Sequence, residues 1–278
     1  MAKIRALHSR DIPALIPLLA EGFPSKSPAY WQAALDVLGA RPQLEPLPQY
    51  GLGLEVEGSL QGVMLMIAGQ RGAQLYCNLS SWYVREDYRT WSPMLFQRAL
   101  RAKGVCFTDC SPADHVLPIV TKFGFHPYTG GSVLIDARAA LRGGGGQVGP
   151  LDVAGVATLD PSEQSLIRAH LDHGCAGFLI TPPDGPAQAA LYRTSRLKKL
   201  VPAARFVSGA PELLLQNAGG LARALLRRGL PLMLIDLPQG LSPSPGRHMP
   251  GYALRYARGT PVPQAGDLLD TEVAVFGF

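Results

Sequence analysis

Apolar positions in the first part of the chain alternate between helical and strand-like spacing. The run KIRALH alternates as a short strand, and apolar side chains from Ile12 to Leu19 then share one helical face, with Ser9 as a candidate N-cap. A second short helix is predicted for SPAYWQAALDVLGA. Three strand-like runs follow, the first two joined as a hairpin and the third antiparallel beside them: 52–57, 63–68 and 75–84.

The stretch WYVREDYRTWSPMLFQRAL, residues 82–100, reads as a strand end, a polar loop and a helix that stops at Gly104. VCFTDC then predicts a strand, a helix follows from about Pro112, and HPYTGGSVLIDA closes this part as a strand. The first half therefore orders as strand, helices, antiparallel strands, helix, strand, helix and strand.

The second half begins after ALRGGGGQVGP, whose glycines Gly143–Gly146 indicate a flexible linker. A phosphate-binding loop is the poorer interpretation, because no Lys-Ser/Thr pair follows the glycines. Helices and strands then alternate again, and the tail Glu272–Phe278 alternates as a strand that completes a second sheet.

Two segments of similar sequence support a duplicated organisation. QRALRAKG (97–104) resembles ARALLRRG (222–229), and each leads into an apolar strand ending in aspartate, VCFTD and LPLMLID. Chance resemblance is the alternative, since helix ends favour basic residues and glycine anyway. With 278 residues, two domains are expected. We predict α/β units at 1–140 and 151–278, with residues 141–150 as the linker.

Composition and charge fit a globular protein with no obvious nucleic-acid role. Hydrophobic residues make up 47% and charged residues 17%, and the net charge of +5 is scattered. An ordinary basic surface is preferred over a nucleic-acid site, because no aromatic residues interleave with the basic ones. No stretch approaches the length needed to cross a membrane, and the first residues lack a secretory apolar region. The spacing of the four cysteines predicts free thiols, so we expect a cytoplasmic protein.

Residues 3 to about 135 resemble the GNAT superfamily of acyl-CoA-dependent N-acyltransferases. IRALHSRDIPALIPLL resembles that family's first strand and helix, and residues 52–68 resemble its central hairpin. WYVREDYRTWSPMLFQRALRAKGVCFTD, followed by VTKFGF, is similar to its cofactor-binding core. The resemblance implies a mixed, mostly antiparallel sheet flanked by helices, with the second half as a degenerate unit of the same type.

The resemblance also implies where acyl-CoA would bind. The family's pantetheine strand corresponds to Trp82, Tyr83 and Val84, and its pyrophosphate loop, normally Arg/Gln-x-x-Gly-x-Gly/Ala, corresponds to Arg89, Thr90, Trp91, Ser92, Pro93 and Met94. Such a loop binds phosphate through backbone amides at a helix N-terminus. Here Thr, Ser and Met replace the glycines and proline has no N–H, so hydroxyls of Thr90 and Ser92 would have to replace amides.

Catalytic residues transfer less clearly from the family. The position of the family's tyrosine acid is occupied by Val120, so candidates come from the same region: Asp109 at a strand end, His115 near the next helix, and Tyr83. An imidazole that titrates near neutral pH suits a general base, although a plain surface histidine is the preferred interpretation of His115.

Other site chemistries are poorly supported. His170, His173 and Cys175 carry ligand-type side chains, but only the two histidines share a helix face and no fourth zinc ligand is evident. No Gly-x-Ser-x-Gly motif, P-loop or dinucleotide fingerprint occurs. We therefore expect no metal.

The expected activity is transfer of an acetyl or other acyl group from acyl-CoA to an amine or hydroxyl of a small-molecule acceptor, by direct attack. The alternative is a non-catalytic binding or scaffold protein that has lost the glycines of the CoA loop. We expect no nucleic-acid or membrane partner, and the sequence leaves the acceptor, the acyl length and the oligomeric state open.

Overall fold

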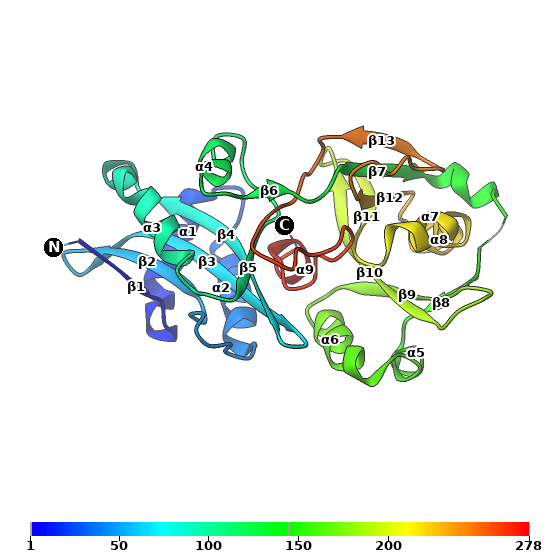
Figure 1. Cartoon of the computed structure of the whole chain (residues 1–278), viewed down its shortest axis with the longest axis horizontal. Helices are drawn as coiled ribbons and strands as arrows, with labels where there is room; N and C mark the ends of the chain where they lie inside the picture. The colour runs from blue at the N-terminus through cyan, green and yellow to red at the C-terminus, as the bar shows by residue number, and fades with distance from the viewer. Residues whose placement is uncertain (1, 144, 278) are drawn as a thin grey trace. The chain divides into compact units, whose positions relative to one another are not determined.

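The computed structural model describes residues 2–143 and 145–277, so parts of the predicted glycine linker and of the predicted tail strand, at residues 144 and 278, lie outside it. The chain forms two compact units (Figure 1). Unit 1 comprises the chain up to His126 with Tyr256–Val262 and Asp270–Glu272, and unit 2 comprises Pro127–Arg255, Pro263–Leu269 and the chain from Val273. Where the sequence predicts a division at 141–150, the units thus divide at residue 127, and unit 1 includes two short segments from late in the chain.

Unit 1 holds a seven-stranded sheet in the order β1-β2-β3-β4-β5-β14-β6. Its strands are β1 (Ala2–Ala6), β2 (Gly51–Val56), β3 (Ser59–Arg71), β4 (Gln74–Val84), β5 (Val105–Asp109), β6 (His126–Pro127) and β14 (Tyr256–Arg258). Its helices are η1 (Ser9–Asp11), α1 (Ile12–Gly22), α2 (Pro28–Ala40), η2 (Glu86–Trp91), α3 (Ser92–Ala99) and α4 (Leu117–Lys122). The predicted hairpin is confirmed as β2 and β3, and β4 lies antiparallel beside β3.

Unit 2 holds a second seven-stranded sheet in the order β13-β7-β12-β11-β10-β9-β8. Its strands are β7 (Gly131–Asp136), β8 (Gln147–Pro150), β9 (Ala176–Thr181), β10 (Gln188–Leu197), β11 (Val201–Ser208), β12 (Leu232–Leu237) and β13 (Arg247–Pro250). Its helices are η3 (Ala137–Leu141), α5 (Val153–Ala157), α6 (Pro161–Asp172), α7 (Pro211–Gln216) and α8 (Ala218–Leu226), and α9 (Glu272–Val275) follows near the chain end.

The two sheets have the same construction. Each contains a single parallel pair with a helical crossover, β4 with β5 and β11 with β12, and the other described pairings are antiparallel. The strand next to the parallel pair comes from the other half of the sequence: β14 follows β5 in unit 1, and β7 follows β12 in unit 2. The predicted mixed, mostly antiparallel architecture in two tandem units is confirmed, and the late strand β14 joins the sheet of unit 1.

The sequence repeat falls at equivalent places in these sheets. Its two copies contain the C-terminal ends of the helices α3 and α8, which precede the parallel strands β5 and β12. Gly104 and Gly229 follow these helices with φ of +71° and +73°, a left-handed conformation that terminates a helix at little cost only for glycine. The matched glycines therefore end equivalent helices in the two units.

Buried apolar side chains provide each unit with its own core. In unit 1 one core cluster lies between α3 and the sheet and includes Met66, Leu79, Leu95 and Phe96, and side chains of α1 and α2 are buried as well. In unit 2 side chains of α7 and α8 cover the sheet around Phe178. These helices form where apolar residues recur at helical spacing and bury one face.

Several predicted elements differ in the structure. The tail predicted as a strand forms the helix α9. All residues of α9 are buried, so the alternation of residue types in the sequence does not correspond to one buried and one exposed face. α4 begins at Leu117 instead of near Pro112. The first helix begins as the 3-10 turn η1, with His8 rather than Ser9 at the N-cap. Strand β10 was not predicted, since its polar half, RTSR, interrupts the apolar pattern.

Candidate functional site

Strand β4 of unit 1 continues well beyond the end of its parallel pairing with β5, and we call the stretch where this pairing stops the fork. β4 pairs with β5 from Leu75 with Val105 to Asn78 with Thr108, and beyond this point the two strands have no further pairing. β4 continues to Val84, still paired with β3 on its other edge. Its backbone groups on the β5 side are thus left without a strand partner, which makes the fork a place where an extended ligand can hydrogen-bond to the backbone.

A β-bulge lies on β4 within this fork. Leu65 pairs with Ser80 and Val63 with Tyr83, so β4 contains one residue more than β3 between these two pairs. Ser81 there adopts a φ of +50°, a left-handed conformation that costs a non-glycine residue about 1 kcal/mol. Bulges and such backbone strain are enriched next to functional sites, where they redirect neighbouring groups.

The bulge changes which face of the sheet the following side chains occupy. Leu79 before it and Trp82 after it both pack in the core under α3, where the ring centroids of Trp82 and Phe96 lie 4.9 Å apart. Tyr83 packs on the opposite face, against Gly22 at the end of α1. The predicted pantetheine-strand residues Trp82 and Tyr83 therefore point to opposite sides of the sheet.

Buried polar side chains gather at the base of the fork. Thr108 Oγ1 donates to Asn78 Oδ1 at 3.2 Å, and the Asn78 amide nitrogen donates to Glu272 Oε2. The Ser111 hydroxyl donates to the other oxygen of the same carboxylate. Asn78 and Glu272 are each 1% exposed. Buried polar groups persist only when hydrogen-bonded, so this chain of contacts fixes the side chains at the point where the strands part.

Tyr83 belongs to a separate cluster on the α1 side. Its hydroxyl donates to Glu21 Oε1 at 2.8 Å, and Arg85 binds the same carboxylate through Nε and Nη2. The Arg85 hydrogen bonds, and then that of Tyr83, lower the pKa of Glu21, whereas desolvation and the bond to Glu21 raise the pKa of Tyr83. The phenolic proton is thus held toward Glu21, away from the fork.

The segment predicted to bind pyrophosphate is helical throughout. η2 runs directly into α3, and the Ser92 backbone N–H donates to Arg89 O instead of pointing outward. Pro93 has no N–H, and the first turn of η2 already carries the acidic side chains of Glu86 and Asp87. The backbone amides that a glycine loop would present to phosphate here donate hydrogen bonds within the 3-10 turn instead.

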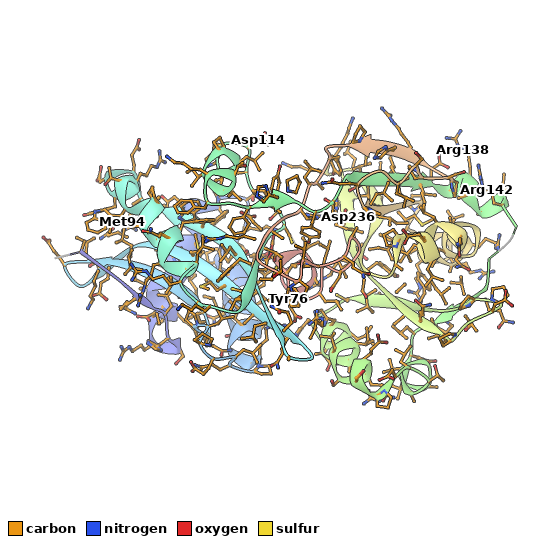
Figure 2. All side chains as sticks on the ribbon, viewed as in Figure 1. Tyr76, Met94, Asp114, Arg138, Arg142 and Asp236 are labelled. Carbon is orange, nitrogen blue, oxygen red and sulfur yellow. The ribbon has the colours of Figure 1, made fainter. Side chains whose placement is uncertain are left out.

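Side chains of this segment still present groups that suit a phosphate. Arg89 and Thr90 are exposed, and Arg89 lies 3.9 Å from Glu86 in an ion pair whose two side chains face solvent. Such an exposed pair contributes little and is easily exchanged. Trp91 packs on the core of unit 1, Val84 is buried, and Met94 is half exposed on α3 (Figure 2).

The remaining predicted catalytic residues lie along the chain after β5. Asp109 ends β5, is buried, and pairs with Tyr256 of β14 in the strand register. His115 is exposed in the turn before α4. No contact in the described residues joins His115 to Asp109 or Tyr83, so these three candidates do not form one catalytic group.

Sequence reasoning missed Asn78, Ser111 and Glu272. A signal for Asn78 was present, because CNLSS places asparagine and serine two apart in an otherwise apolar strand, on one face of the sheet. Glu272 was the one acidic residue in the apolar tail TEVAVF. These two residues meet because a segment near the end of the chain returns to unit 1, and no local sequence pattern predicts such a long-range contact.

The equivalent position in unit 2 carries a different arrangement. Pairing of β11 with β12 ends at Arg205 and Leu234. Asp236 Oδ2 there accepts from Arg255 Nε at 2.7 Å, Ser132 Oγ donates to Asp236 Oδ1, and Arg205 Nη1 lies 3.6 Å from the same oxygen. Burial lowers the pKa of Arg205. The polar groups at this end of the second sheet are thus engaged with one another in an ion cluster, so the fork in unit 1 is the better candidate site.

The described residues form neither a metal-binding cluster nor a reactive thiol site. Residues 2–143 and 145–277 contain no group of three or more His, Cys, Asp or Glu arranged for a metal. His170 Nδ1 pairs with Leu166 O at 2.9 Å, and the Cys175 thiol donates to Ala274 O at 3.6 Å. All four cysteines are buried thiols outside any disulfide, and burial raises the pKa of Cys106 to about 11. Buried neutral thiols are poor nucleophiles.

Comparison with known proteins yields matches at the level of structure only. No family model and no curated protein matches the sequence. A candidate acetyltransferase from Pyrococcus horikoshii superposes with a TM-score of 0.59 at 13% identity, covering 96% of this chain and 92% of its own. The GCN5-related N-acetyltransferase from Anabaena variabilis also gives 0.59, at 14% identity, covering 93% and 72%.

The chain has the GNAT fold. Both matches extend over nearly the whole chain and therefore over both units. The resemblance stated from sequence for the first half is confirmed as a fold. Among the described helices of this GNAT-fold chain, none is both long and apolar enough to cross a membrane.

Proposed function

We propose that this chain is an acyltransferase that binds acyl-CoA at the β4–β5 fork of unit 1 and transfers the acyl group to a small amine or hydroxyl acceptor. The observation that carries the proposal is the fork itself, with the bulge at Ser81 on its β4 side. An extended pantetheine arm has amide groups along its length, and the unpaired edge of β4 offers it the complementary backbone groups.

The phosphate end of the cofactor would meet side chains rather than amides. Ser92, Thr90 and Arg89 lie at or next to the α3 N-terminus, where positive helix-dipole charge adds to that of arginine. Pyrophosphate would displace Glu86 from its exposed contact with Arg89. We expect weaker CoA binding than a glycine loop gives, because fewer donors converge on the phosphates.

The reaction would proceed by direct attack within the fork. The acceptor's lone pair forms a bond to the thioester carbonyl carbon, the carbon–sulfur bond breaks, and the acceptor's proton leaves by way of a nearby carboxylate to the departing thiolate. Asp109, at the end of β5, is the candidate for that carboxylate. Asn78 and Glu272 are proposed as positioning residues, because their contacts hold the base of the fork.

A thermal shift titration with CoA and acetyl-CoA tests the proposal. Saturable stabilisation is expected, and Ser92→Glu should abolish it because a carboxylate at the α3 N-terminus repels pyrophosphate. The matched control is Gln97→Glu, which adds the same charge at an exposed position further along the same helix. No shift at millimolar CoA, or equal shifts in both variants, would exclude the cofactor site.

A non-catalytic binding or scaffold role is the second candidate. It is favoured by one specific observation, the use of the Ser92 amide within the η2 turn, which leaves the loop without its usual phosphate donor. A protein of this kind would keep the fold and the buried cluster around Glu272 but show no CoA-dependent stabilisation. The same titration therefore separates the two functions.

A further inference from the structure

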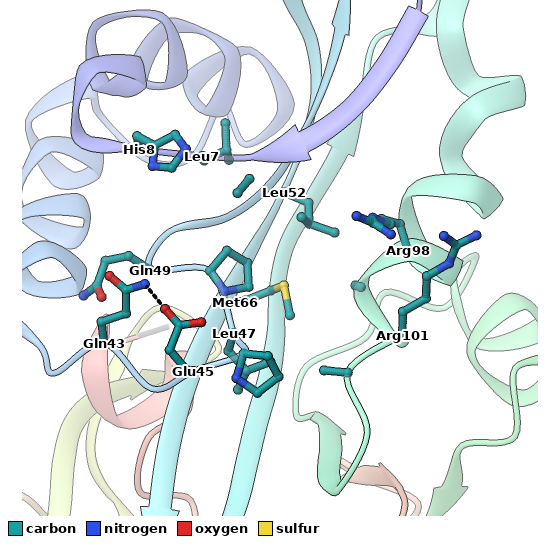
Figure 3. Close-up of a pocket in the computed structure, with 15 residues that line it drawn as sticks. Leu7, His8, Gln43, Glu45, Leu47, Gln49, Leu52, Met66, Arg98 and Arg101 are labelled. Carbon is teal, nitrogen blue, oxygen red and sulfur yellow. Dashed lines mark hydrogen bonds between the residues drawn. The ribbon is translucent and has the colours of Figure 1, made fainter.

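A cavity of about 410 Å³ lies in unit 1, away from the fork. It is bounded by the end of β1, the loop between α2 and β2, strands β2 and β3, and the C-terminal end of α3 (Figure 3). Its floor is apolar and consists of Leu7, Leu47, Leu52 and Met66. The volume lies within the range of about 300–1,000 Å³ that holds small organic ligands.

Two arginines form one side of this cavity. Arg98 in the last turn of α3 and Arg101 just after it carry their side chains on the cavity side formed by that helix (Figure 3). No hydrogen bond or ion pair engages either guanidinium within the described residues, and both residues are exposed. An unpaired guanidinium beside an apolar surface is suited to bind a carboxylate or a phosphate in bidentate fashion.

The repeat in unit 2 shows that the equivalent arginine has a structural role there. Arg223 occupies the position in ARALLRRG that Arg98 occupies in QRALRAKG. Its Nη1 donates to Ala140 O at 2.8 Å and to Arg142 O at 2.9 Å. The equivalent side chain in unit 1 has no such structural task, so its charge is available to a ligand.

The wall across the cavity is held in place by its own hydrogen bonds. Gln43 Nε2 donates to Glu45 Oε1 at 2.8 Å (Figure 3), and Gln49 Nε2 donates to Arg41 O at 2.8 Å. The loop is thus braced to α2, and its one carboxylate stands across from the two arginines. This separation orients a ligand, with its anionic group at the arginines and its apolar part on the floor.

We propose that this cavity binds an organic anion with an apolar body, such as an aryl or alkyl carboxylate. The inference does not rest on acyl transfer, because the cavity adjoins the C-terminal end of α3 whereas the cofactor site adjoins its N-terminal end. A flat aromatic or short aliphatic body would displace water from the leucine and methionine side chains, and the carboxylate would pair with Arg98 and Arg101.

The test is binding of 2-naphthoate to the full chain, measured by titration calorimetry and by the ligand's fluorescence. Saturable binding at one site is expected, with at least fivefold weaker affinity for 2-naphthamide, which keeps the apolar body but lacks the charge. Arg98→Gln should weaken 2-naphthoate binding about tenfold, as should Arg101→Gln, because each removes a charged donor. Glu45→Gln should strengthen it, since a like charge is removed.

The matched control is Arg227→Gln, which removes an exposed arginine after α8 and should leave binding unchanged. These surface substitutions leave the core intact, so circular dichroism should show native folding in all of them. Absence of saturable 2-naphthoate binding, equal affinity for the amide, or undiminished binding in both Arg98→Gln and Arg101→Gln would overturn the proposal. CoA stabilisation is measured separately and is expected to be unaffected by Arg98→Gln.

Discussion

The side-chain amide of Asn78, in the middle of β4, donates a hydrogen bond to the carboxylate of Glu272, which lies 194 residues further along the chain. Both side chains are almost completely buried within unit 1. Ser111 donates to the second carboxylate oxygen, so Glu272 satisfies two donors at once. The segment near the chain end thereby contributes a polar group to the base of the fork.

Two replacements of Glu272 should separate the contribution of its hydrogen bonds to stability from the contribution of its charge. Glu272→Ala leaves the Asn78 amide buried without this acceptor, which should lower the free energy of unfolding by about 2–3 kcal/mol. Glu272→Gln keeps an oxygen for Asn78, and the Ser111 hydroxyl can rotate to accept, so a loss below about 1 kcal/mol is expected. Urea unfolding measures both, and an alanine variant as stable as the glutamine variant would contradict this role.

Asp236 in unit 2 balances the buried Arg255 and the largely buried Arg205. The Arg255 side chain is 4% exposed and that of Arg205 is 12% exposed, and both lie against this one carboxylate. Asp236→Asn should therefore cost about 3–5 kcal/mol, because it leaves buried charges uncompensated.

Asp136→Asn is the control for this substitution. Asp136 pairs with the 88% exposed Arg138, and an exposed ion pair contributes less than about 1 kcal/mol. Thermal or urea unfolding should show a large loss for Asp236→Asn and almost none for Asp136→Asn. Similar small losses in both variants would refute the buried-cluster interpretation.

Asp11 gives unit 1 a pH-dependent contribution to stability. Its carboxylate accepts from Arg5 Nη1 and Nη2, both at 2.8 Å, and the hydrogen bonds from Arg5 are the largest cause of its lowered pKa. Because the folded pKa is depressed, the contribution is complete above the unfolded value of about 3.9 and disappears as the pH falls through the lower folded pKa.

Asp11→Asn should lower the free energy of unfolding by about 2 kcal/mol at pH 7. The difference from the native chain should hold down to about pH 5 and shrink below about pH 4, since the native carboxyl is then protonated. Urea unfolding at a series of pH values measures this, with the exposed Asp36→Asn as control. A difference that stays constant to pH 2 would disprove the account.

Local pattern was sufficient to predict most of unit 1. Alternation identified β2, β3 and β4, and Gly104 with its basic helix end marked α3, because these features depend on neighbours along the chain. The same reasoning failed for sheet membership: β7 was predicted as the closing strand of the first half but joins the second sheet, and β14 was not predicted. Only tertiary pairing decides which sheet each strand joins.

The candidate site was predicted at its strand and missed at its base. Trp82, Tyr83 and Val84 were placed on a strand next to a helix, as the structure has them, but the bulge at Ser81 that turns Tyr83 toward α1 leaves no mark in the residue pattern. The loop at Ser92 lacked glycines, and the structure shows the physical result, a continuous 3-10 and α-helical segment.

Hydrogen exchange with and without acetyl-CoA tests the central claim most directly, because it locates binding as well as detecting it. If acyl-CoA occupies the fork, amides of β4 between Ser80 and Val84 and those around Ser92 should gain protection, while the equivalent strand β11 in unit 2 should exchange unchanged. Protection confined to other elements, or none at millimolar acetyl-CoA, would contradict the proposal that this GNAT-fold chain binds its acyl donor between β4 and β5.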